Sequence, residues 1–532
     1  MELPCRRNLL AAAVIAALGL TACGDDATGS GGAAARTTTT ATDATGVTAG
    51  TITSTSGAST SAGTTSTVSS SDSSSSSGGG GAGGSGGAES TGGGGEGGGG
   101  EGGGALVPNH LWSKRFGDAD YQTGRVVASD PSGYVLLGAY LAGGTDFGGG
   151  LVTSAGTIDA GVVKLDPDGN HIWSKALGGS YEDRVDAITT DASGNVIVAG
   201  TFGGTVDFGG GPLTSTGPVN LSAYVVKLDA DGNHLWSVTF PGDGFQQVTS
   251  VATDAAENVV VTGYFVMTAN FGGNPITSAG APGKADGFLV KLDAGGNHIW
   301  SEAFGADGDD VVAGVAADDD DNVIITGAFQ NTVDFGGGPL TSVQSNDAFV
   351  AKLDPSGGHV WSKQFGGQSE QAGRAVASDA TGDTLVVGTF RSTVDFGGGA
   401  LTSAGQGDVF VVKLDVSGNH VWSNRYGGSE SESVVSLAAD ASGNVLVLGE
   451  NGFAPIDLGG GSLGPGIFVA KLDASGSHVW SSGFDAEHAY SMAIDPSDNV
   501  LFTGGFLGTV DFGGGQMTSA GDWDVFLVKM GP

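Results

Sequence analysis

The chain has 532 residues and a formal net charge of −37, with 101 glycines and two cysteines. This length exceeds what a single hydrophobic core usually organises. Such an acidic chain repels nucleic acid and anionic lipid headgroups, which argues against a nucleic-acid partner and leaves cationic partners open.

The first 22 residues have the pattern of a secretion signal. Arg6 and Arg7 precede an apolar stretch at residues 9–20, which is too short to span a bilayer comfortably. The following Leu20-Thr21-Ala22-Cys23 resembles a bacterial lipobox, in which the signal peptide is cleaved before a cysteine that receives lipid. We therefore predict lipidation at Cys23. The alternative is an ordinary secretory signal followed by a chance cysteine.

A lipid at Cys23 has consequences for location and for cysteine chemistry. Gly24 stands where retention in the inner membrane needs an aspartate, so the resemblance implies the outer membrane of a bacterial cell envelope. Cys5 leaves with the signal peptide and Cys23 bears the lipid, so no disulfide or cysteine metal site remains. We expect the membrane to be contacted through the lipid anchor alone.

Residues 23–105 are almost entirely Gly, Ser, Thr and Ala. Hardly any large apolar side chain is present to offset the entropy of ordering, so we predict a disordered linker that begins at the lipidated cysteine. For a Gly-rich coil of about 80 residues the root-mean-square span is roughly 50 Å, which holds a domain away from a membrane.

Residues 106–532 contain seven repeats. Tryptophans recur at spacings of 58 to 64 residues, and each follows a histidine by two positions. A period near 60 residues is typical of a four-stranded β-propeller blade with its loops. The pairs are His110 and Trp112, His171 and Trp173, His234 and Trp236, His298 and Trp300, His359 and Trp361, His420 and Trp422, and His478 and Trp480.

One repeat shows the expected order of strands. Alternating or β-branched runs at residues 183–191, 195–202, 224–229 and 234–240 predict strands A, B, C and D of one blade. Asp, Gly and Asn in the A–B and C–D connections predict tight turns. Between strands B and C, residues 206–211 predict a longer irregular connection.

The two ends of the repeat region predict how the ring closes. The region begins with a lone strand D at residues 110–116 and ends with a strand C at residues 524–530 that has no following strand D. Together they complete one blade, which removes the open edge of the sheet. We therefore predict an all-β fold, a seven-bladed β-propeller over residues 106–532, preceded by a signal peptide (1–22) and a linker (23–105).

The repeat unit is similar to a known bacterial family. Its sequence V-D-F-G-G-G-x-L-T-S-x-G, followed by D-x-F-V-x-K-L-D-x-x-G-N-H-x-W-S, resembles the bacterial β-propeller repeat known as SBBP and recurs at residues 333–342, 394–403 and 510–519. The resemblance extends over the whole repeat region and implies the fold. It also implies a place among the surface and secreted proteins of myxobacteria and related bacteria, and it supplies no catalytic residue.

Three kinds of repeated residue are site candidates with a structural alternative. We interpret the histidines as turn-closing or tryptophan-packing groups, because a sevenfold ring near the rim separates them widely. Asp-rich turns, such as residues 166–170, 229–233 and 318–321, partly resemble calcium loops. They offer too few side chains for calcium, so β-turns are the better interpretation. Lysines recur in strand C and argue against a single basic patch; they are Lys164, Lys227, Lys291, Lys352, Lys413, Lys471 and Lys529.

Positions at which the repeats differ are better candidates for function. One position of strand A, expected near the central channel, holds Arg125, Asp186, Arg374 and Tyr490 in four blades and Thr249, Ala313 and Val435 in the others. The four polar residues are compatible with a channel site or with structural variation. His488, outside the repeat pattern, has no partner evident in the sequence, and one histidine alone is weak evidence for a ligand or a base.

The favoured function is a non-enzymatic binding module for an unidentified protein or polysaccharide, presented on the lipid anchor and linker. An envelope assembly scaffold and a propeller enzyme with a site in the central channel are the alternatives. The sequence contains no CxxC, HExxH or P-loop motif, so we predict no catalytic, cofactor-binding or metal-binding residues and no cofactor. We expect a monomer.

Overall fold

The computed structural model describes residues 108–216, 221–280, 282–452 and 454–532. The predicted signal peptide, Cys23 and the predicted linker lie outside these residues, so those expectations stay predictions. The described residues form 42 β-strands and no α-helix. They therefore contain no helix long and apolar enough to cross a membrane.

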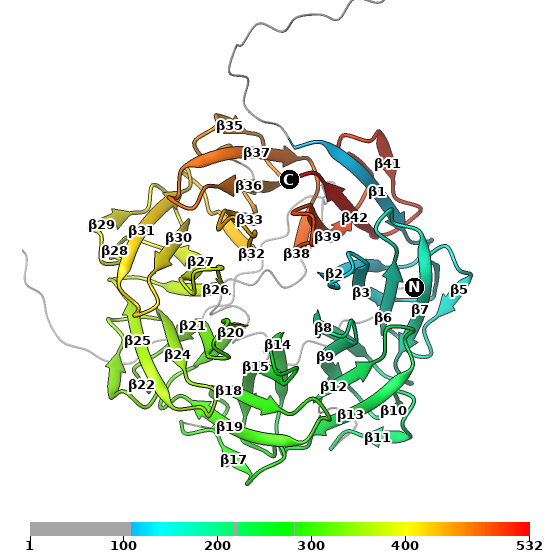
Figure 1. The fold of residues 1–532 in the computed structure, drawn as a ribbon, viewed down its shortest axis with the longest axis horizontal. Coiled ribbons are helices and arrows are strands. Elements are labelled where there is room, and N and C mark those ends of the chain that lie inside the picture. Colours follow the sequence, from blue (N-terminus) through cyan, green and yellow to red (C-terminus); the bar gives the residue numbers. More distant parts are fainter. Residues whose placement is uncertain (1–107, 217–220, 281, 453) are drawn as a thin grey trace, which may run out of the picture. The chain divides into compact units, whose positions relative to one another are not determined.

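Seven four-stranded antiparallel sheets are arranged around a central channel as the blades of a β-propeller, which confirms the predicted fold (Figure 1). In each blade, strand A lies next to the channel and strand D lies on the outside (Figure 1). Chain direction alternates along each blade, so the A–B and C–D turns lie on one face, which we call the turn rim. The B–C and D–A connections start from the other face, which we call the loop rim.

Each blade consists of strands A, B, C and D, counted outward from the channel. Blade 1 has β2 (Gln122–Ser129), β3 (Val135–Leu141), β6 (Asp159–Leu165) and β7 (His171–Leu177). Blade 2 has β8 (Asp183–Thr190), β9 (Val196–Phe202), β12 (Ser222–Leu228) and β13 (His234–Phe240). Blade 3 has β14 (Gln246–Thr253), β15 (Val259–Val266), β18 (Ala285–Leu292) and β19 (His298–Phe304). Blade 4 has β20 (Val311–Ala317), β21 (Val323–Phe329), β24 (Asp347–Leu353) and β25 (His359–Phe365).

The remaining blades have the same arrangement. Blade 5 has β26 (Gln371–Ser378), β27 (Thr384–Phe390), β30 (Asp408–Leu414) and β31 (His420–Tyr426). Blade 6 has β32 (Ser433–Ala439), β33 (Val445–Glu450), β36 (Ile467–Leu472) and β37 (His478–Phe484). Blade 7 has β38 (His488–Ile494), β39 (Val500–Phe506), β42 (Asp524–Met530) and β1 (His110–Phe116). The strands predicted in blade 2 are confirmed to within two residues at each end.

The B–C connection differs from the prediction. Residues 206–211 are not irregular but belong to a two-stranded hairpin of β10 (Thr205–Asp207) and β11 (Pro212–Thr214), paired from Thr205 with Thr214 to Asp207 with Pro212. Its strands have only three residues, too few to show a period of two in the sequence. Asp207 Oδ1 closes the turn by accepting the N–H groups of Gly209 and Gly211 at 2.8 and 3.0 Å.

Each of the seven blades has such a hairpin, and the hairpins lie outside the fourth strands (Figure 1). The other six are β4 (Gly144–Asp146) with β5 (Leu151–Thr153), β16 (Thr268–Ala269) with β17 (Ile276–Thr277), β22 (Thr332–Asp334) with β23 (Pro339–Thr341), β28 (Thr393–Asp395) with β29 (Ala400–Thr402), β34 (Ile456–Asp457) with β35 (Ser462–Leu463), and β40 (Thr509–Asp511) with β41 (Gln516–Thr518). In blade 2, the hairpin residue Phe208 stacks on Tyr224 of strand C with ring centroids 4.6 Å apart. The repeated phenylalanine therefore anchors the hairpin to its blade by aromatic packing.

The predicted ring closure is confirmed. β1 pairs antiparallel with β42, from His110 opposite Met530 to Phe116 opposite Val525. Gly531 adds a backbone hydrogen bond by donating its N–H to the carbonyl of Asn109 at 2.7 Å. Residues more than 400 positions apart thus complete one sheet, and strand C of that blade is not left as an open edge.

Candidate functional site

Each blade has a buried ion pair at the turn rim. In blade 2, Lys227 Nζ lies 2.7 Å from Asp191 Oδ2, and both side chains are almost fully buried. Asp191 also shapes the A–B turn, because its Oδ1 accepts the N–H groups of Ser193 and Asn195 at 3.0 and 2.9 Å. The other pairs are Lys164 with Asp130, Lys291 with Asp254, Lys352 with Asp318, Lys413 with Asp379, Lys471 with Asp440, and Lys529 with Asp495. The repeated lysines are therefore part of the scaffold.

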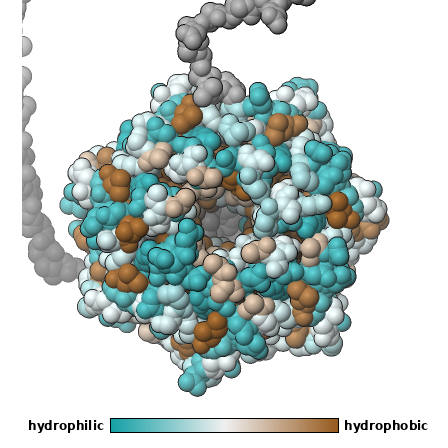
Figure 2. All heavy atoms as spheres, in the orientation of Figure 1, coloured by the Kyte–Doolittle hydropathy of each residue, from teal (hydrophilic) through white to brown (hydrophobic). Residues whose placement is uncertain are grey.

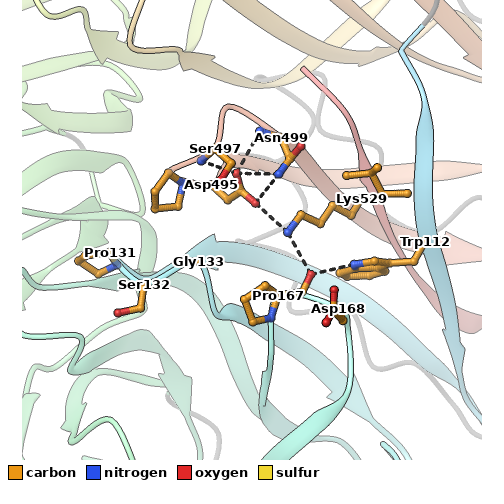
Figure 3. Close-up of a pocket in the computed structure, with 12 residues that line it drawn as sticks. Trp112, Pro131, Ser132, Gly133, Pro167, Asp168, Asp495, Ser497, Asn499 and Lys529 are labelled. Atoms are coloured by element: carbon orange, nitrogen blue, oxygen red, sulfur yellow. Dashed lines mark hydrogen bonds and ion pairs between the residues drawn. The ribbon is translucent and has the colours of Figure 1, made fainter.

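Neighbouring blades are joined at the same rim (Figure 3). Trp112 Nε1 of blade 7 donates to the carbonyl of Pro167 in blade 1 at 3.0 Å, and Lys529 Nζ donates to the same carbonyl at 3.0 Å (Figure 3). Lys529 also pairs with Asp495 at 2.7 Å. These residues lie around a cleft of about 470 Å³ between the two blades. Because the same contacts recur between other blades, this cleft is a consequence of the repeat.

The Asp-rich C–D turns are hydrogen-bonded β-turns. Asp166 Oδ1 accepts the N–H groups of Asp168 and Asn170 at 3.0 and 2.7 Å, and Asp166 Oδ2 accepts from Asn170 Nδ2 at 2.9 Å. Both carboxylate oxygens are thus already used by the turn. The run 318–321 lies in the A–B turn of blade 4. There Asp318 pairs with Lys352, and Asp321 Oδ1 accepts the N–H of Ala255 in blade 3.

The repeated histidines hold the hairpins. In blade 2, a Cβ on Gly210 would lie only 2.4 Å from Cε1 of His234, so the imidazole covers the middle glycine of the Gly-Gly-Gly turn. His234 Nε2 lies 3.1 Å from Ser237 Oγ of the same strand. The structure thus refines the expected scaffold role, because these rings pack on the hairpin glycines.

The differing residues of strand A share one structural feature. In all seven blades this position is a β-bulge, skipped in the pairing between strands A and B; the residues are Arg125, Asp186, Thr249, Ala313, Arg374, Val435 and Tyr490. A bulge frees the extra residue from the ladder and can redirect its side chain. All seven are partly exposed although they lie on the innermost strands. The space-filling view shows the ring hollowed at its centre (Figure 2).

Three of the four predicted polar residues meet across blades 7, 1 and 2. The guanidinium carbon of Arg125 lies 4.0 Å from the ring centroid of Tyr490 and 4.8 Å from that of Tyr140. The Tyr140 hydroxyl donates to Asp186 Oδ1 at 3.0 Å. The result is a continuous chain from Tyr490 through Arg125 and Tyr140 to Asp186, held by two cation–π contacts and one hydrogen bond.

His488 extends this chain at the loop rim. Its ring stacks on Trp523, with centroids 5.2 Å apart and planes inclined by 15°, and lies 5.9 Å from the ring of Tyr490. Its Nδ1 lies 3.4 Å from Glu450 Oε1 of blade 6, and this contact raises the pKa of His488. No partner for His488 was evident in the sequence, whereas the structure supplies several. We call Arg125, Tyr140, Asp186, His488, Tyr490 and Trp523 the polar-aromatic sector.

The opposite part of the channel wall lacks this character. The bulge positions of blades 4, 5 and 6 are Ala313, Arg374 and Val435. The buried residues Val311, Ala328 and Ala372 of blades 4 and 5 pack with Tyr264 of blade 3 in one apolar cluster. Arg374 is the fourth predicted polar residue and lies outside the polar-aromatic sector. Burial lowers its pKa to about 10. Among the described residues, none forms an ion pair with its guanidinium.

The polar-aromatic sector is better suited to binding than to proton transfer. Burial raises the pKa of Asp186, against the lowering effect of Arg184 and Arg125, and burial raises the pKa of Tyr140 above its usual range. Tyr140 and Asp186 are bonded to each other, and Arg125 is held between two aromatic rings. Half-buried aromatic rings with polar tips next to a fixed cation are typical of recognition surfaces.

Sequence reasoning missed Tyr140, Glu450 and Trp523. Tyr140 is the sixth residue of its strand B, and the residues at this position in the seven blades are Tyr140, Thr201, Tyr264, Ala328, Thr389, Glu450 and Gly505. That column varies as strongly as the bulge column and would have identified Tyr140 and Glu450. Trp523 lies just before strand C, outside any repeated column.

Comparison with known proteins finds relatives of low identity. No family model matches it. It is 22% identical to a WD repeat-containing protein of Acanthamoeba polyphaga mimivirus, over 74% of this chain and 36% of that protein. It is 25% identical to the regulatory protein FlaEY of Caulobacter vibrioides, over 55% of this chain and 31% of that protein. The chain therefore covers only about a third of each of these two relatives.

Solved structures also match the chain at low identity. The crystal structure of Sqt1 from Chaetomium thermophilum aligns over 80% of this chain and all of that chain, with 11% identity and a TM-score of 0.41. The fold itself is established by the seven blades described above.

Proposed function

We propose that the protein is a non-enzymatic binding module that recognises a protein or polysaccharide partner at the loop rim of its channel. The observation that carries this proposal is the polar-aromatic sector, where Arg125, Tyr140, Asp186 and Tyr490 from three blades form one connected group. Aromatic residues and arginine are enriched in binding hot spots. The relatives are in agreement, since one is named as a WD repeat-containing protein and the other as a regulatory protein.

The proposed location is the outer membrane of a bacterial envelope, with lipid on Cys23 and residues 24–105 as a flexible linker. Support comes from Leu20-Thr21-Ala22-Cys23 directly after an apolar stretch. The same proposal assigns the repeat to the SBBP type, supported by its V-D-F-G-G-G motif. Mass spectrometry of the N-terminal peptide should find a lipid-modified Cys23, and an unmodified Cys23 in the mature protein would contradict this part.

The binding proposal is tested by comparing two parts of one channel. The full chain is cross-linked to its neighbours in intact envelopes and is also applied to a glycan array. We expect Tyr490→Ala with Trp523→Ala to abolish the enriched partner, whereas Arg374→Ala in strand A of blade 5, on the other side of the channel, leaves it unchanged. A partner that is lost equally in both variants, or that is captured by the linker alone, would contradict a site in the polar-aromatic sector.

The same experiment distinguishes a binding module from an envelope scaffold. An envelope scaffold would retain several protein neighbours after Tyr490→Ala with Trp523→Ala, because its contacts would be spread around the rims. A binding module should lose one partner class. The two outcomes are distinguishable by counting which cross-linked species disappear.

A further inference from the structure

Aromatic residues occur at the loop rim of blades 7, 1, 2 and 3. Tyr121, Tyr181 and Phe245 stand at the last or next-to-last position of the D–A connections that lead into blades 1, 2 and 3. Trp523 lies directly before strand C of blade 7. The D–A connections into blades 4, 5 and 6 contain no aromatic residue. We call the four residues the aromatic crescent, because they occupy only one part of the rim.

The rings of the aromatic crescent are held in place and are accessible to a partner. Tyr181 is 46% exposed and packs on Gly204 of blade 2, where an added Cβ would lie 2.3 Å from Tyr181 Cδ2. Phe245 packs against Tyr264, with ring centroids 6.0 Å apart. The other rings of the crescent are partly exposed, as is Phe245. Rigid aromatic side chains supply contact area at a low cost in conformational entropy.

An exposed aspartate lies next to three of the four rings along the chain. None of the three carboxylates forms an ion pair within the described residues. At the fourth ring, Glu182 follows Tyr181 but is already paired with Arg184 at 2.5 Å. The three aspartates are Asp120 before Tyr121, Asp243 two positions before Phe245, and Asp522 before Trp523.

The loop rim has no free positive charge in the described part of the chain. Arg125 lies in the channel wall, with its guanidinium between the rings of Tyr490 and Tyr140. The exposed carboxylates of the crescent are therefore left for a partner, in a chain whose formal net charge is −37. The lysines and arginines of the rim are all paired, Arg115 with Asp524, Arg184 with Glu182, Lys284 with Asp309, Arg391 with Glu370, and Arg425 with Asp408.

An aromatic face beside a carboxylate suits an ammonium or guanidinium group. The face of the ring attracts a cation, and the carboxylate forms a charge-assisted hydrogen bond with it. A neutral polysaccharide would stack on the rings but would leave the aspartates in the interface without a counter-charge, which costs free energy. An anionic polysaccharide would be repelled.

We propose that the aromatic crescent binds a protein segment that carries lysine or arginine side chains. The inference rests on the proposed function and narrows its partner to a basic protein. Trp523 belongs both to the crescent and to the polar-aromatic sector, so the bound segment follows the rim outward from the channel mouth. Each cation of the segment contacts a ring and its neighbouring aspartate.

The test compares two probes of the full chain by fluorescence anisotropy. One probe is a short labelled peptide of alternating arginine and leucine, and the other has citrulline, a neutral isostere, in place of each arginine. We expect the arginine peptide to bind at least about tenfold more tightly than the citrulline peptide. Equal affinities, or binding of neither peptide, would overturn the proposal.

Two variants of equal net charge locate the binding site, because a basic peptide is attracted weakly to any acidic surface. Asp120→Asn with Asp243→Asn removes two charges from the crescent. Asp307→Asn with Glu430→Gln removes two exposed charges from the connections into blades 4 and 6, which have no aromatic residue. We expect the first variant to weaken the arginine peptide about tenfold and the second to leave its affinity nearly unchanged. Equal losses would indicate non-specific attraction and would overturn the proposal.

The contribution of the rings is tested at Tyr181, the most exposed aromatic residue of the crescent. Tyr181→Ala should weaken the arginine peptide about two- to fivefold, as expected for an exposed cation–π contact. Tyr181→Phe keeps the ring and should retain the affinity of the unaltered chain. An affinity that is the same in both variants would contradict binding of the cation to the ring.

Failure of this inference is distinguishable from failure of the proposed function. A glycan that is lost in Tyr490→Ala with Trp523→Ala, but is retained in Asp120→Asn with Asp243→Asn, would support the proposed site and overturn a basic partner. Loss of the arginine peptide in both double variants would support both proposals.

Discussion

The two rims of the propeller use the same amino acids in opposite ways. At the turn rim, buried carboxylates are matched by lysines in all seven blades, as in Lys227 with Asp191. At the loop rim, buried carboxylates such as Asp286 and Asp310 lack a matching cation among the described residues, and aromatic residues occur in some blades but not in others. The turn rim therefore stabilises the ring in the same way in every blade, whereas the loop rim differs from blade to blade and is the rim at which we propose that a partner binds.

The channel wall shows the same contrast at one position, the bulge of strand A. A bulge occurs in every strand A, yet its residue is Arg125 or Tyr490 in one part of the wall and Ala313 or Val435 in another. The backbone feature belongs to the fold, and the side chain is free to vary. Because the bulge takes this residue out of the strand ladder, its side chain can vary and can take part in recognition without loss of sheet hydrogen bonds.

Removal of the closing strand, β1, should have the largest effect on stability, because it affects both rims at once. Deleting residues 106–117 removes β1 and exposes the edge of β42 over its whole length. We expect cooperative unfolding to be lost, measured by calorimetry or by circular dichroism on heating. A single sharp native transition in this deletion would show that the ring does not depend on closure.

Breaking one turn-rim ion pair should have the next largest effect. Lys227→Met leaves Asp191 buried without its cation, which should lower the free energy of unfolding by about 3–5 kcal/mol in denaturant titration. Lys284→Met is the control at the loop rim. Lys284 is 40% exposed in its pair with Asp309, so its loss should cost no more than about 1 kcal/mol. Equal losses at both sites would remove the distinction between the rims.

The pH dependence of the free energy of unfolding should come from carboxylates at the loop rim. Burial raises the pKa of Asp183 and of Asp286 to about 6 and that of Asp310 to about 7, so the folded chain binds protons more tightly than the unfolded chain. The free energy of unfolding should therefore fall as the pH rises from about 4, the ordinary pKa of an aspartate, to about 7. His488 acts in the same direction, because Glu450 raises its pKa.

The control for the pH dependence is Asp183→Asn with Asp310→Asn, which removes two of the carboxylates with a raised pKa and should flatten the profile. The turn rim should contribute nothing in this range, because hydrogen bonds and lysines lower the pKa of carboxylates such as Asp191 against the effect of burial. A profile that is unchanged in the double variant would assign the dependence to other groups.

The smallest expected effect concerns one irregularity of the turn rim. Trp361 Nε1 donates to the carbonyl of Val416 at 3.1 Å, whereas Trp480 Nε1 is buried without a partner in the described residues. Trp480 faces blade 7, where β42 and β1 replace a continuous C–D turn. Both tryptophans are at least 92% buried. Trp361→Phe should therefore cost about 1 kcal/mol more stability than Trp480→Phe, the value of one hydrogen bond, in chemical denaturation. Equal costs would show that the indole bond contributes little.

Much of the fold could be predicted because the repeat is local. The spacing of Trp173, Trp236 and their equivalents predicts the number of blades, and the strand runs of one repeat match β8, β9, β12 and β13 to within two residues. The hairpin of β10 and β11 could not be predicted, because three-residue strands leave too short a pattern. Its stability comes from Phe208 packing on Tyr224 and from His234 covering Gly210, which are contacts between distant positions.

The candidate site was predictable only in part. Comparing the repeats identified Arg125, Asp186 and Tyr490 as exceptions at one position, and the structure joins them into one group. The fourth exception, Arg374, lies apart. Tyr140 links the group and Trp523 extends it, and neither follows from the strand A column, because contacts between blades depend on the ring.

By itself, the sequence determined the seven blades, the order of their strands, the closing blade and the positions at which the repeats disagree. It could do so because each blade is encoded within about 60 residues by a repeated pattern. Only the tertiary structure decided which exceptional residues meet and which buried carboxylates lack a cation. Asp286 and Asp310 belong to different blades and different strands. Their proximity, and the absence of a nearby charge to balance them among the described residues, is fixed by the packing of one blade on the next.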